Sequence, residues 1–256
     1  MNALHEYTEE FFEYIERGST ASAKRFSAFV TPLLGVGSIL DVGCGRGAWL
    51  REWRDAGVKI VHGADGPYVR RESLLIPADD FTAVDLSQKF DLGRRYDMVS
   101  SLEVAEHLPP SASEAFISSL VTHSDLILFS AATRGQGGEN HINERPLWYW
   151  QGVFAEHGYV AFDAIRPHFQ HDALVEPWYR YNSILYASPM RIPALPHSVL
   201  SARVDGRVKE IGDLRWRVRR SLLRFLPSTT VTMLSKWNYR RLNRAYRGAK
   251  KSVDAA

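Results

Sequence analysis

The chain has 256 residues, enough to bury the core of one large α/β domain with an appendage, and its 45% hydrophobic and 24% charged residues are ordinary for a globular protein. Its single cysteine, Cys44, excludes an internal disulfide; with no signal-peptide pattern and no apolar run of about 18 residues, it leads us to expect a cytoplasmic location. The net charge of +3 divides unevenly, since residues 1–202 sum to −8 and residues 203–256 to +11, which predicts an acidic body with a basic tail.

Apolar periodicity predicts helices that alternate with short strands up to about residue 190. The expected helices, with a break at Gly18-Ser19-Thr20 and a capping box at Ser111 and Glu114, are 4–17, 21–34, 46–56, one that opens at 111, and 147–157. The expected strands are 38–42, 59–64, 81–84, 96–101, 125–130, 159–165 and 182–187. This alternation is typical of an α/β fold. We expect three parts: an N-terminal helical lid (1–35), a core (36–190) and a basic, mainly helical C-terminal extension (191–256).

The turn after the first strand carries the clearest signal for a ligand. It reads Asp41-Val42-Gly43-Cys44-Gly45-Arg46-Gly47, and a helix follows at once. Glycines let the backbone turn tightly and approach a ligand, and the helix N-terminus adds unpaired N–H groups. A carboxylate two residues before the first glycine would repel a pyrophosphate but suits a ligand that carries an ammonium group. The P-loop pattern is absent, which argues against a nucleoside triphosphate. A glycine-rich turn without a ligand is the alternative.

The D-x-G-x-G-x-G run resembles motif I of class I S-adenosylmethionine (SAM)-dependent methyltransferases. The resemblance implies a Rossmann-like, mostly parallel seven-stranded sheet with helices on both faces and a last strand that inserts antiparallel. It also implies SAM as cofactor, with the methionine part held by the turn residues Asp41, Gly43, Cys44 and Gly45. The chain departs from the family before the fifth strand, where Thr122-His-Ser-Asp125 replaces a common Pro-Gly-Gly turn.

Further cofactor contacts are expected at the ends of the next strands. Asp65 follows the second strand, where an acid can accept hydrogen bonds from both ribose hydroxyls, although Asp65-Gly66 is also a good turn pair. The resemblance implies that Asp85 and Leu86 meet the adenine and that Leu102 and Glu103 line the cofactor edge. The lid residues expected to face the cofactor are Tyr14 and Ser19.

Two segments offer groups for catalysis. Glu106-His107-Leu-Pro109 follows the fourth strand, and His141-Ile-Asn-Glu144 lies in the loop after the fifth. Open α/β sheets hold their ligands at these strand ends, and histidine titrates near neutrality. We expect His107, His141 and Glu144 to act as general base or to position the acceptor. The alternative for Glu106 and His107 is a structural role in the turn before Pro109.

A metal site is a further possibility. Glu103-x-x-Glu106-His107 together with His141 resembles the metal-binding pattern of RNA 3′-terminal 2′-O-methyltransferases and of some quinone O-methyltransferases. Such a set could hold Mg²⁺ or Mn²⁺ and lower the pKa of an acceptor hydroxyl. Metal-free relatives carry the same letters, so both interpretations stay open.

The acceptor is suggested only by resemblance. The stretch Phe129–Trp150, together with Tyr14–Ser19, looks like bacterial methyltransferases of glycan and natural-product pathways. We therefore expect O-methylation of a sugar hydroxyl in a glycan or a glycosylated natural product. The alternatives are an RNA 2′-O-methyltransferase and a SAM-binding regulator without turnover. Aromatic residues could wall the acceptor pocket or pack in the core: Trp148, Tyr149, Trp150, Trp178, Tyr179 and Tyr181.

The basic C-terminal extension has near-heptad apolar spacing over 204–225, ended by Pro227, and a second aromatic and basic stretch over 231–248. Three interpretations stay open. The helices could pack on the body or on a second copy of the chain. They could lie on the inner face of a membrane, where basic and aromatic residues suit an anionic surface. They could bind nucleic acid, for which the sequence shows no known motif.

Overall fold

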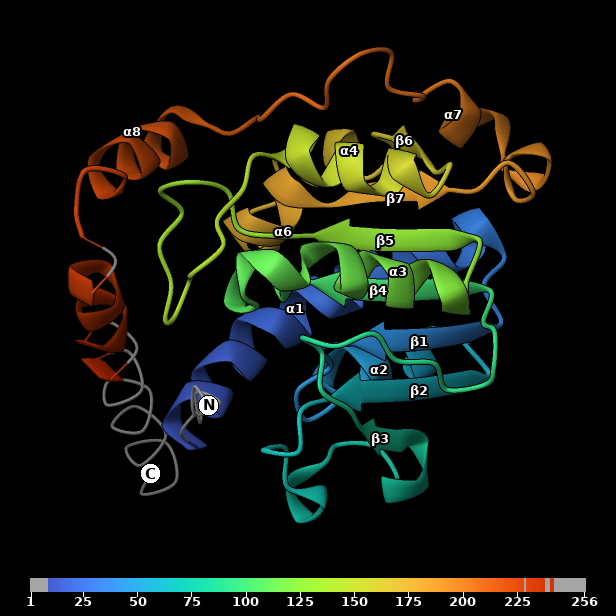
Figure 1. Ribbon diagram of the computed structural model, residues 1–256, viewed down its shortest axis with the longest axis horizontal. Helices are drawn as coiled ribbons and strands as arrows, with labels where there is room; N and C mark the ends of the chain where they lie inside the picture. Colours follow the sequence, from blue (N-terminus) through green and yellow to red (C-terminus); the bar gives the residue numbers. More distant parts are fainter. Residues whose placement is uncertain (1–8, 228, 238–239, 242–256) are drawn as a thin grey trace, which may run out of the picture.

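A computed structural model describes residues 9–227, 229–237 and 240–241, with side chains from Gly18 onward. Its centre is a seven-stranded sheet of order β3-β2-β1-β4-β5-β7-β6 (Figure 1). The strands are β1 (Ser38–Val42), β2 (Ile60–Asp65), β3 (Phe81–Ala83), β4 (Met98–Leu102), β5 (Leu126–Ser130), β6 (Val160–Phe162) and β7 (Ile184–Ala187). All neighbours pair in parallel except β7, which runs antiparallel to both β5 and β6. The predicted seven-stranded, mostly parallel sheet is confirmed.

Helices cover both faces of the sheet, because the central strands are buried on both sides and alternate residues feed two apolar layers. On one face lie α1 (Glu9–Leu34) and α2 (Ala48–Asp55), and on the other lie α3 (Ser113–His123) and α4 (Leu147–Glu156). The remaining helices are α5 (Arg166–Phe169), α6 (Pro177–Asn182), α7 (His197–Leu200) and α8 (Leu214–Leu223). No helix in the described part of the chain is long and apolar enough to cross a membrane.

The N-terminal segment differs from the expectation of two helices. α1 runs unbroken through Gly18, so the predicted break is wrong. A Cβ at Gly18 would lie 2.6 Å from Glu176 Oε1, and Glu176 N donates to Ser22 Oγ (3.0 Å). The glycine therefore permits close packing between distant segments. The second half of α1 also belongs to the core, since Phe26 and Val30 are fully buried.

Two local predictions of helix starts are also corrected. Ser111 does not cap a helix: it lies in a 3-10 turn, and α3 begins at Ser113 without a side-chain cap. Glu114 instead pairs with His157 Nε2 at 2.9 Å. The predicted heptad helix does not begin near 204, because α8 starts at Leu214. Asp213 caps it by accepting a hydrogen bond from Trp216 N at 2.8 Å.

Candidate functional site

A cavity opens at the carboxyl ends of the parallel strands, where open α/β sheets bind ligands. Its walls come from the glycine turn, the loops after β4 and β5, and parts of α1, α2, α6 and α8. Most of the residues predicted from the sequence meet here: Ser19, Asp41, Gly43, Cys44, Gly45, Asp65, Leu86, Leu102, Glu103, Glu106, His107 and His141. The side chain of Tyr14 lies outside the described residues.

The glycine turn is shaped by contacts that no side chain could replace. Gly43 has φ 83°, and a Cβ there would lie 2.3 Å from Val104 in the loop after β4. Its N–H donates to Ala64 O at 2.7 Å, at the end of β2. Glycine adopts this left-handed conformation without steric cost. The turn therefore lies close to two neighbouring strand ends and leaves backbone groups along the cavity.

Asp65 is a buried carboxylate that orders this turn. Its Oδ2 accepts from Gly45 N (2.6 Å), and its Oδ1 accepts from Gly66 N (2.6 Å) and from the Tyr68 hydroxyl (2.5 Å). Burial raises the pKa of Asp65, while these hydrogen bonds oppose that effect. Tyr68 was not predicted from the sequence, since nothing in the local pattern marks it.

Asp41 lies beside Asp65 at the same end of the cavity. Only 4% of the residue is exposed, and Ser100 Oγ donates to its Oδ1 at 2.6 Å. Burial raises the pKa of Asp41 to about 7; the Ser100 hydrogen bond opposes this and the Asp65 charge adds to it. Two buried carboxyl groups near the carboxyl ends of adjacent strands favour a cationic ligand over a phosphate.

The two residues expected at the adenine, Asp85 and Leu86, have different surroundings. Leu86 is buried on the cavity wall, whereas Asp85 is exposed and does not line the cavity. The Asp85 carboxylate accepts from Ser87 N (2.9 Å) and Ser87 Oγ (2.7 Å), which directs it into its own turn. The Asp85 carboxylate thus takes part in its own turn, and its contact with adenine stays a prediction.

Hydrogen bonds from distant residues hold the Glu103 carboxylate in the loop after β4. Glu103 has φ 59°; its Oε2 accepts from Gln136 Nε2 and its Oε1 from Asn182 Nδ2 (3.3 Å). Burial raises the pKa of Glu103, and these hydrogen bonds oppose the effect. Glu103 lines the cavity but is not in the compact metal-ligand group of the described residues, so its role as the fourth ligand of the expected quartet stays a prediction.

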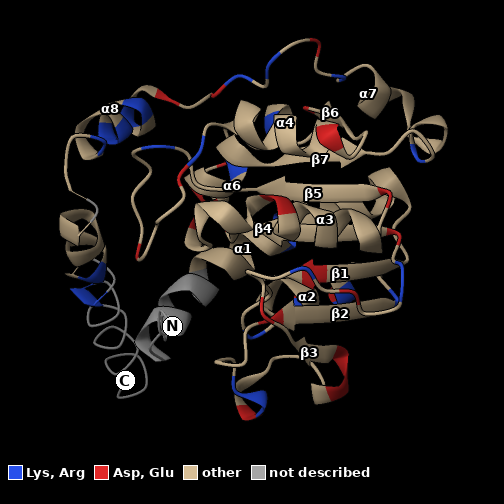
Figure 2. Cartoon of the chain, viewed as in Figure 1, with Lys and Arg blue, Asp and Glu red and all other residues tan. Residues whose placement is uncertain are grey.

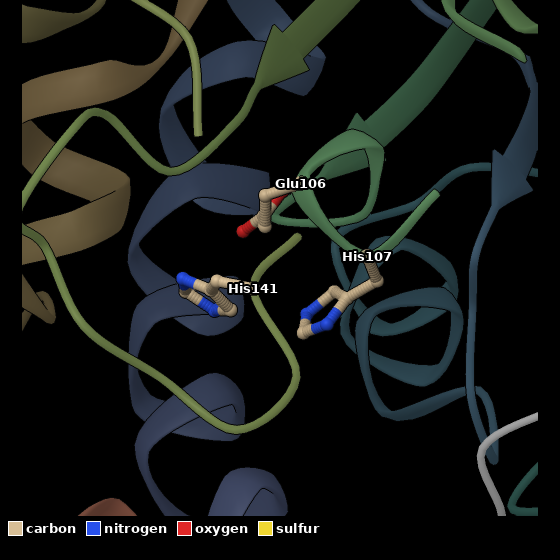
Figure 3. A group of neighbouring side chains, drawn as sticks. All are labelled: Glu106, His107 and His141. Atoms are coloured by element: carbon tan, nitrogen blue, oxygen red, sulfur yellow. The ribbon is translucent and has the colours of Figure 1, made fainter. Parts of the chain in front are cut away.

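The other three members of that quartet do meet. One ligand atom from each of Glu106, His107 and His141 lies within 4.8 Å of the others, and Figure 3 shows the three side chains pointing toward a common space. Glu106 is fully buried, and neither of its carboxylate oxygens has a hydrogen-bond partner among the described residues. Burial, then the nearby charge of Glu103, raises the pKa of Glu106 well above its usual range. These donors fit a divalent ion.

His141 is oriented by Glu144. The imidazole Nδ1–H donates to Glu144 Oε1 at 3.0 Å, which leaves Nε2 as the nitrogen able to accept a proton or bind a metal. Glu144 also accepts from Gly135 N (2.8 Å) and Gly137 N (3.1 Å). Burial alone would raise the pKa of Glu144, but the bonds to His141 and to these amides lower it overall. Glu144 thus holds both the histidine and its loop and does not line the cavity.

The C-terminal extension contributes to the site in a way the sequence did not indicate. Arg219 of α8 and Ser235 line the cavity. Arg219 Nη1 donates to Gln136 O at 2.5 Å, Arg220 Nη2 donates to Arg134 O at 3.0 Å, and Lys236 Nζ pairs with Glu139 Oε1 at 3.1 Å. The loop after β5 therefore lies between the sheet and the extension (Figure 1). Its contact with α8 is not encoded by any local pattern.

Of the aromatic residues expected at an acceptor pocket, two line the cavity: Trp178 and Tyr179. Tyr179 OH lies 3.0 Å from Ser19 Oγ, which ties α6 to α1. Trp150 is fully buried in the core, and Trp148 is 45% exposed beneath Arg207. The core interpretation therefore holds for Trp150, and Trp148 does not line the cavity.

Comparison with known proteins gives a consistent result. The family described as "Methyltransferase domain" matches residues 5–174, more than half of the chain. An O-methyltransferase family protein from Burkholderia thailandensis has a similar fold (TM-score 0.52, 14% identity); the match covers 70% of this chain and 58% of that protein. The sugar N-methyltransferase KedS8 from a Streptoalloteichus species has TM-score 0.50 and 15% identity over 73% of this chain and 96% of its own. The plantazolicin methyltransferase BpumL in complex with SAH gives TM-score 0.50 and 14% identity over 70% of this chain and 89% of its own. No curated protein matches the sequence.

The buried Asp41 carboxyl generates a stability prediction. The pKa of this carboxyl is 3.8 in the unfolded chain and about 7 in the folded chain. Below the unfolded pKa the carboxyl is protonated in both states. Between the two pKa values only the unfolded chain loses the proton, which favours unfolding. The wild type should therefore lose stability as pH rises to 7, by about 4 kcal/mol in total. Asp41→Asn should escape this loss. Urea unfolding at pH 4 and pH 8 measures it; an equal effect of the substitution at both pH values would show that the folded carboxyl is not protonated.

Proposed function

We propose a specific methyl transfer for this chain, which belongs to the methyltransferase domain family and has the fold of class I SAM-dependent methyltransferases. The proposed reaction is O-methylation of a sugar hydroxyl in a glycan or a glycosylated natural product. The observation that carries it is His141, which lines the same cavity as the glycine turn and is oriented by its hydrogen bond to Glu144.

The chemistry of the cavity fits SAM. Two buried carboxylates, Asp41 and Asp65, lie beside the glycine turn and would be stabilised by a cationic ligand. When bound, SAM supplies a methyl group on a sulfonium, which an oxygen can displace in line. We assign the ribose hydroxyls to Asp65, where they would replace the hydrogen bond from Tyr68, and the methionine part to Asp41 and the turn.

His141 is the proposed general base. An acceptor hydroxyl must lose its proton near the transition state, and His141 Nε2 is the ring nitrogen left to receive it. The Glu144 carboxylate fixes the imidazole orientation and stabilises the imidazolium that forms. Because hydrogen bonds lower the pKa of Glu144, it remains ionised at neutral pH.

Two observations support a sugar acceptor: the residues of the cavity wall and the acceptors named for proteins of similar structure. Trp178 and Tyr179 offer aromatic surface, while Arg219 and Ser235 offer hydrogen-bond donors, a combination that suits a polyol. The similar structures include a sugar N-methyltransferase and a plantazolicin methyltransferase, which support a small-molecule acceptor but not the choice of oxygen over nitrogen.

A metal-dependent RNA 2′-O-methyltransferase is the second candidate. It is favoured by Glu106, a buried carboxylate without a hydrogen-bond partner among the described residues, beside His107 and His141. These three residues would hold Mg²⁺ or Mn²⁺, which lowers the pKa of a bound hydroxyl. The +11 charge of residues 203–256 suits RNA. The two candidates exclude each other at His141, since Nε2 cannot bind a metal and accept a proton together.

The assignment of Asp65 predicts a loss of cofactor affinity. Asp65→Asn should weaken SAM binding by about tenfold or more, because charge-assisted bonds to the ribose are lost. Calorimetric titration with SAM measures this. Asp125→Asn is the matched control, since Asp125 pairs with Arg95 and does not line the cavity. Unchanged affinity in Asp65→Asn would remove the residue from the cofactor site.

The assignment of His141 predicts a loss of turnover with cofactor binding retained. His141→Gln should slow methyl transfer by about a hundredfold or more, and Glu144→Gln should slow it less. Labelled SAM with fractionated native extract supplies the acceptor and the readout. The control is His157→Gln, because His157 makes a similar pair with Glu114 on the surface. Turnover unchanged in His141→Gln would exclude the general-base role. SAM affinity without transfer to any acceptor would favour a non-catalytic regulator.

The metal candidate is tested by Mn²⁺ binding itself. If Glu106, His107 and His141 hold an ion, chelator-treated protein should bind one Mn²⁺ in a calorimetric titration, and Glu106→Gln should abolish that binding. The control Glu114→Gln removes a surface carboxylate that also pairs with a histidine. If the wild-type chain binds no Mn²⁺, the metal-dependent candidate is excluded and the general-base proposal stands alone.

A further inference from the structure

The C-terminal arm, defined as the described residues of 214–241 with α8 at its start, carries most of the large exposed apolar side chains of the described chain. Of thirteen exposed large apolar side chains, eight lie within residues 214–237. They are Leu214, Val218, Leu222, Phe225, Leu226, Met233, Leu234 and Trp237. Single exposed apolar residues are ordinary, but a concentrated set marks an interaction surface.

On α8 these residues form one face. Leu214, Val218 and Leu222 recur every four residues and are 75%, 49% and 66% exposed. Phe225 continues the face just after the helix and is 82% exposed. The face has no partner among the described residues, although the helix itself is well anchored.

The anchoring uses other side chains of the same arm. Trp216 is buried against Tyr181, with ring centroids 5.8 Å apart. Arg219 and Arg220 donate to backbone carbonyls of the loop after β5, and Lys236 pairs with Glu139. The exposed face is therefore not needed to attach the arm to the body.

The charge of the arm is of one sign. Residues 214–241 contain eight Lys or Arg and no Asp or Glu. They are Arg215, Arg217, Arg219, Arg220, Arg224, Lys236, Arg240 and Arg241. Figure 2 shows this basic character over α8 and over the helical stretch that follows.

We propose that the C-terminal arm docks on an anionic lipid bilayer, with the face of Leu214, Val218, Leu222 and Phe225 inserted among the lipids and the arginines at the headgroups. Helices that lie in a membrane interface combine an apolar face with basic flanks in this way. Lys and Arg near an anionic surface add electrostatic attraction.

The same observations disfavour other occupants. Nucleic acid matches the charge but offers little apolar surface to cover the leucine and valine side chains. A second arm matches the apolar face but would bring sixteen positive charges together with no acid between them. An anionic bilayer matches both the apolar face and the charge.

Docking would also affect access to the cavity. Arg219 and Ser235, both on the arm, line the cavity wall. A bilayer beneath the arm would therefore lie next to the cavity and favour acceptors held at a membrane surface. The docking itself does not depend on the proposed methyl transfer.

Vesicle cosedimentation of the full chain without SAM tests the proposal. We expect binding to phosphatidylcholine vesicles that contain about one third phosphatidylglycerol, at least tenfold weaker binding to pure phosphatidylcholine, and weakening as salt is raised. The double variants Val218→Asp/Leu222→Asp and Arg215→Glu/Arg217→Glu should each reduce binding at least tenfold. Met190→Asp is the control, since Met190 is 82% exposed outside the arm. Calorimetric SAM binding confirms that each variant is folded.

Several results would overturn the proposal. Equal affinity for neutral and anionic vesicles would remove the electrostatic contribution, and full binding by Val218→Asp/Leu222→Asp would remove the apolar one. Dimers in analytical ultracentrifugation that Val218→Asp/Leu222→Asp dissociates would assign the face to a second copy. Tighter binding to an RNA oligomer than to anionic vesicles would assign the arm to nucleic acid. Vesicle binding and methyl transfer can each fail alone, so the two proposals remain distinguishable.

Discussion

The close approach of the glycine turn to its neighbours is the constraint on which the site depends. Gly43 lies against Val104, its N–H bonds to Ala64 O, and Gly45 N–H bonds to the Asp65 carboxylate. These contacts bring the ends of β1, β2 and β4 to one cavity. They leave the buried Asp41 and Asp65 carboxyl groups close together beside the cavity, an arrangement that favours a cationic ligand.

Sequence patterns predicted the sheet because its determinants are local. Buried strands are apolar runs bounded by turns, and the seven runs fall within a few residues of the observed strands. The errors arose where distant residues decide the outcome. Glycine generally weakens a helix, yet at Gly18 its small size lets α1 pack against Glu176. Ser111 has the spacing of a capping box, yet α3 begins at Ser113 without a side-chain cap.

The two histidine segments also combine a feature that the sequence predicted with one that it did not. Their placement at strand ends follows from topology and could be predicted, and the structure brings His107 and His141 to a ring-centroid distance of 4.8 Å. The sequence predicted one shared role for His141 and Glu144, as general base or in positioning the acceptor, and did not show that Glu144 orients the imidazole. Its two oxygens accept hydrogen bonds from the amides of Gly135 and Gly137 and from the imidazole, so one carboxylate positions both the loop and the His141 ring.

The contact between the loop after β5 and α8 has a consequence for biosynthesis. Gly135 and Gly137 pack against Arg220 and Leu223, and Arg219 bonds to Gln136 O. The partners of this loop in α8 are therefore synthesised after the loop itself and after every strand of the sheet. The sheet and the glycine turn can form earlier, but the wall that carries His141 reaches its observed surroundings only after α8 has been synthesised. Chains cut short before α8 retain the parts that hold the cofactor and lack this support.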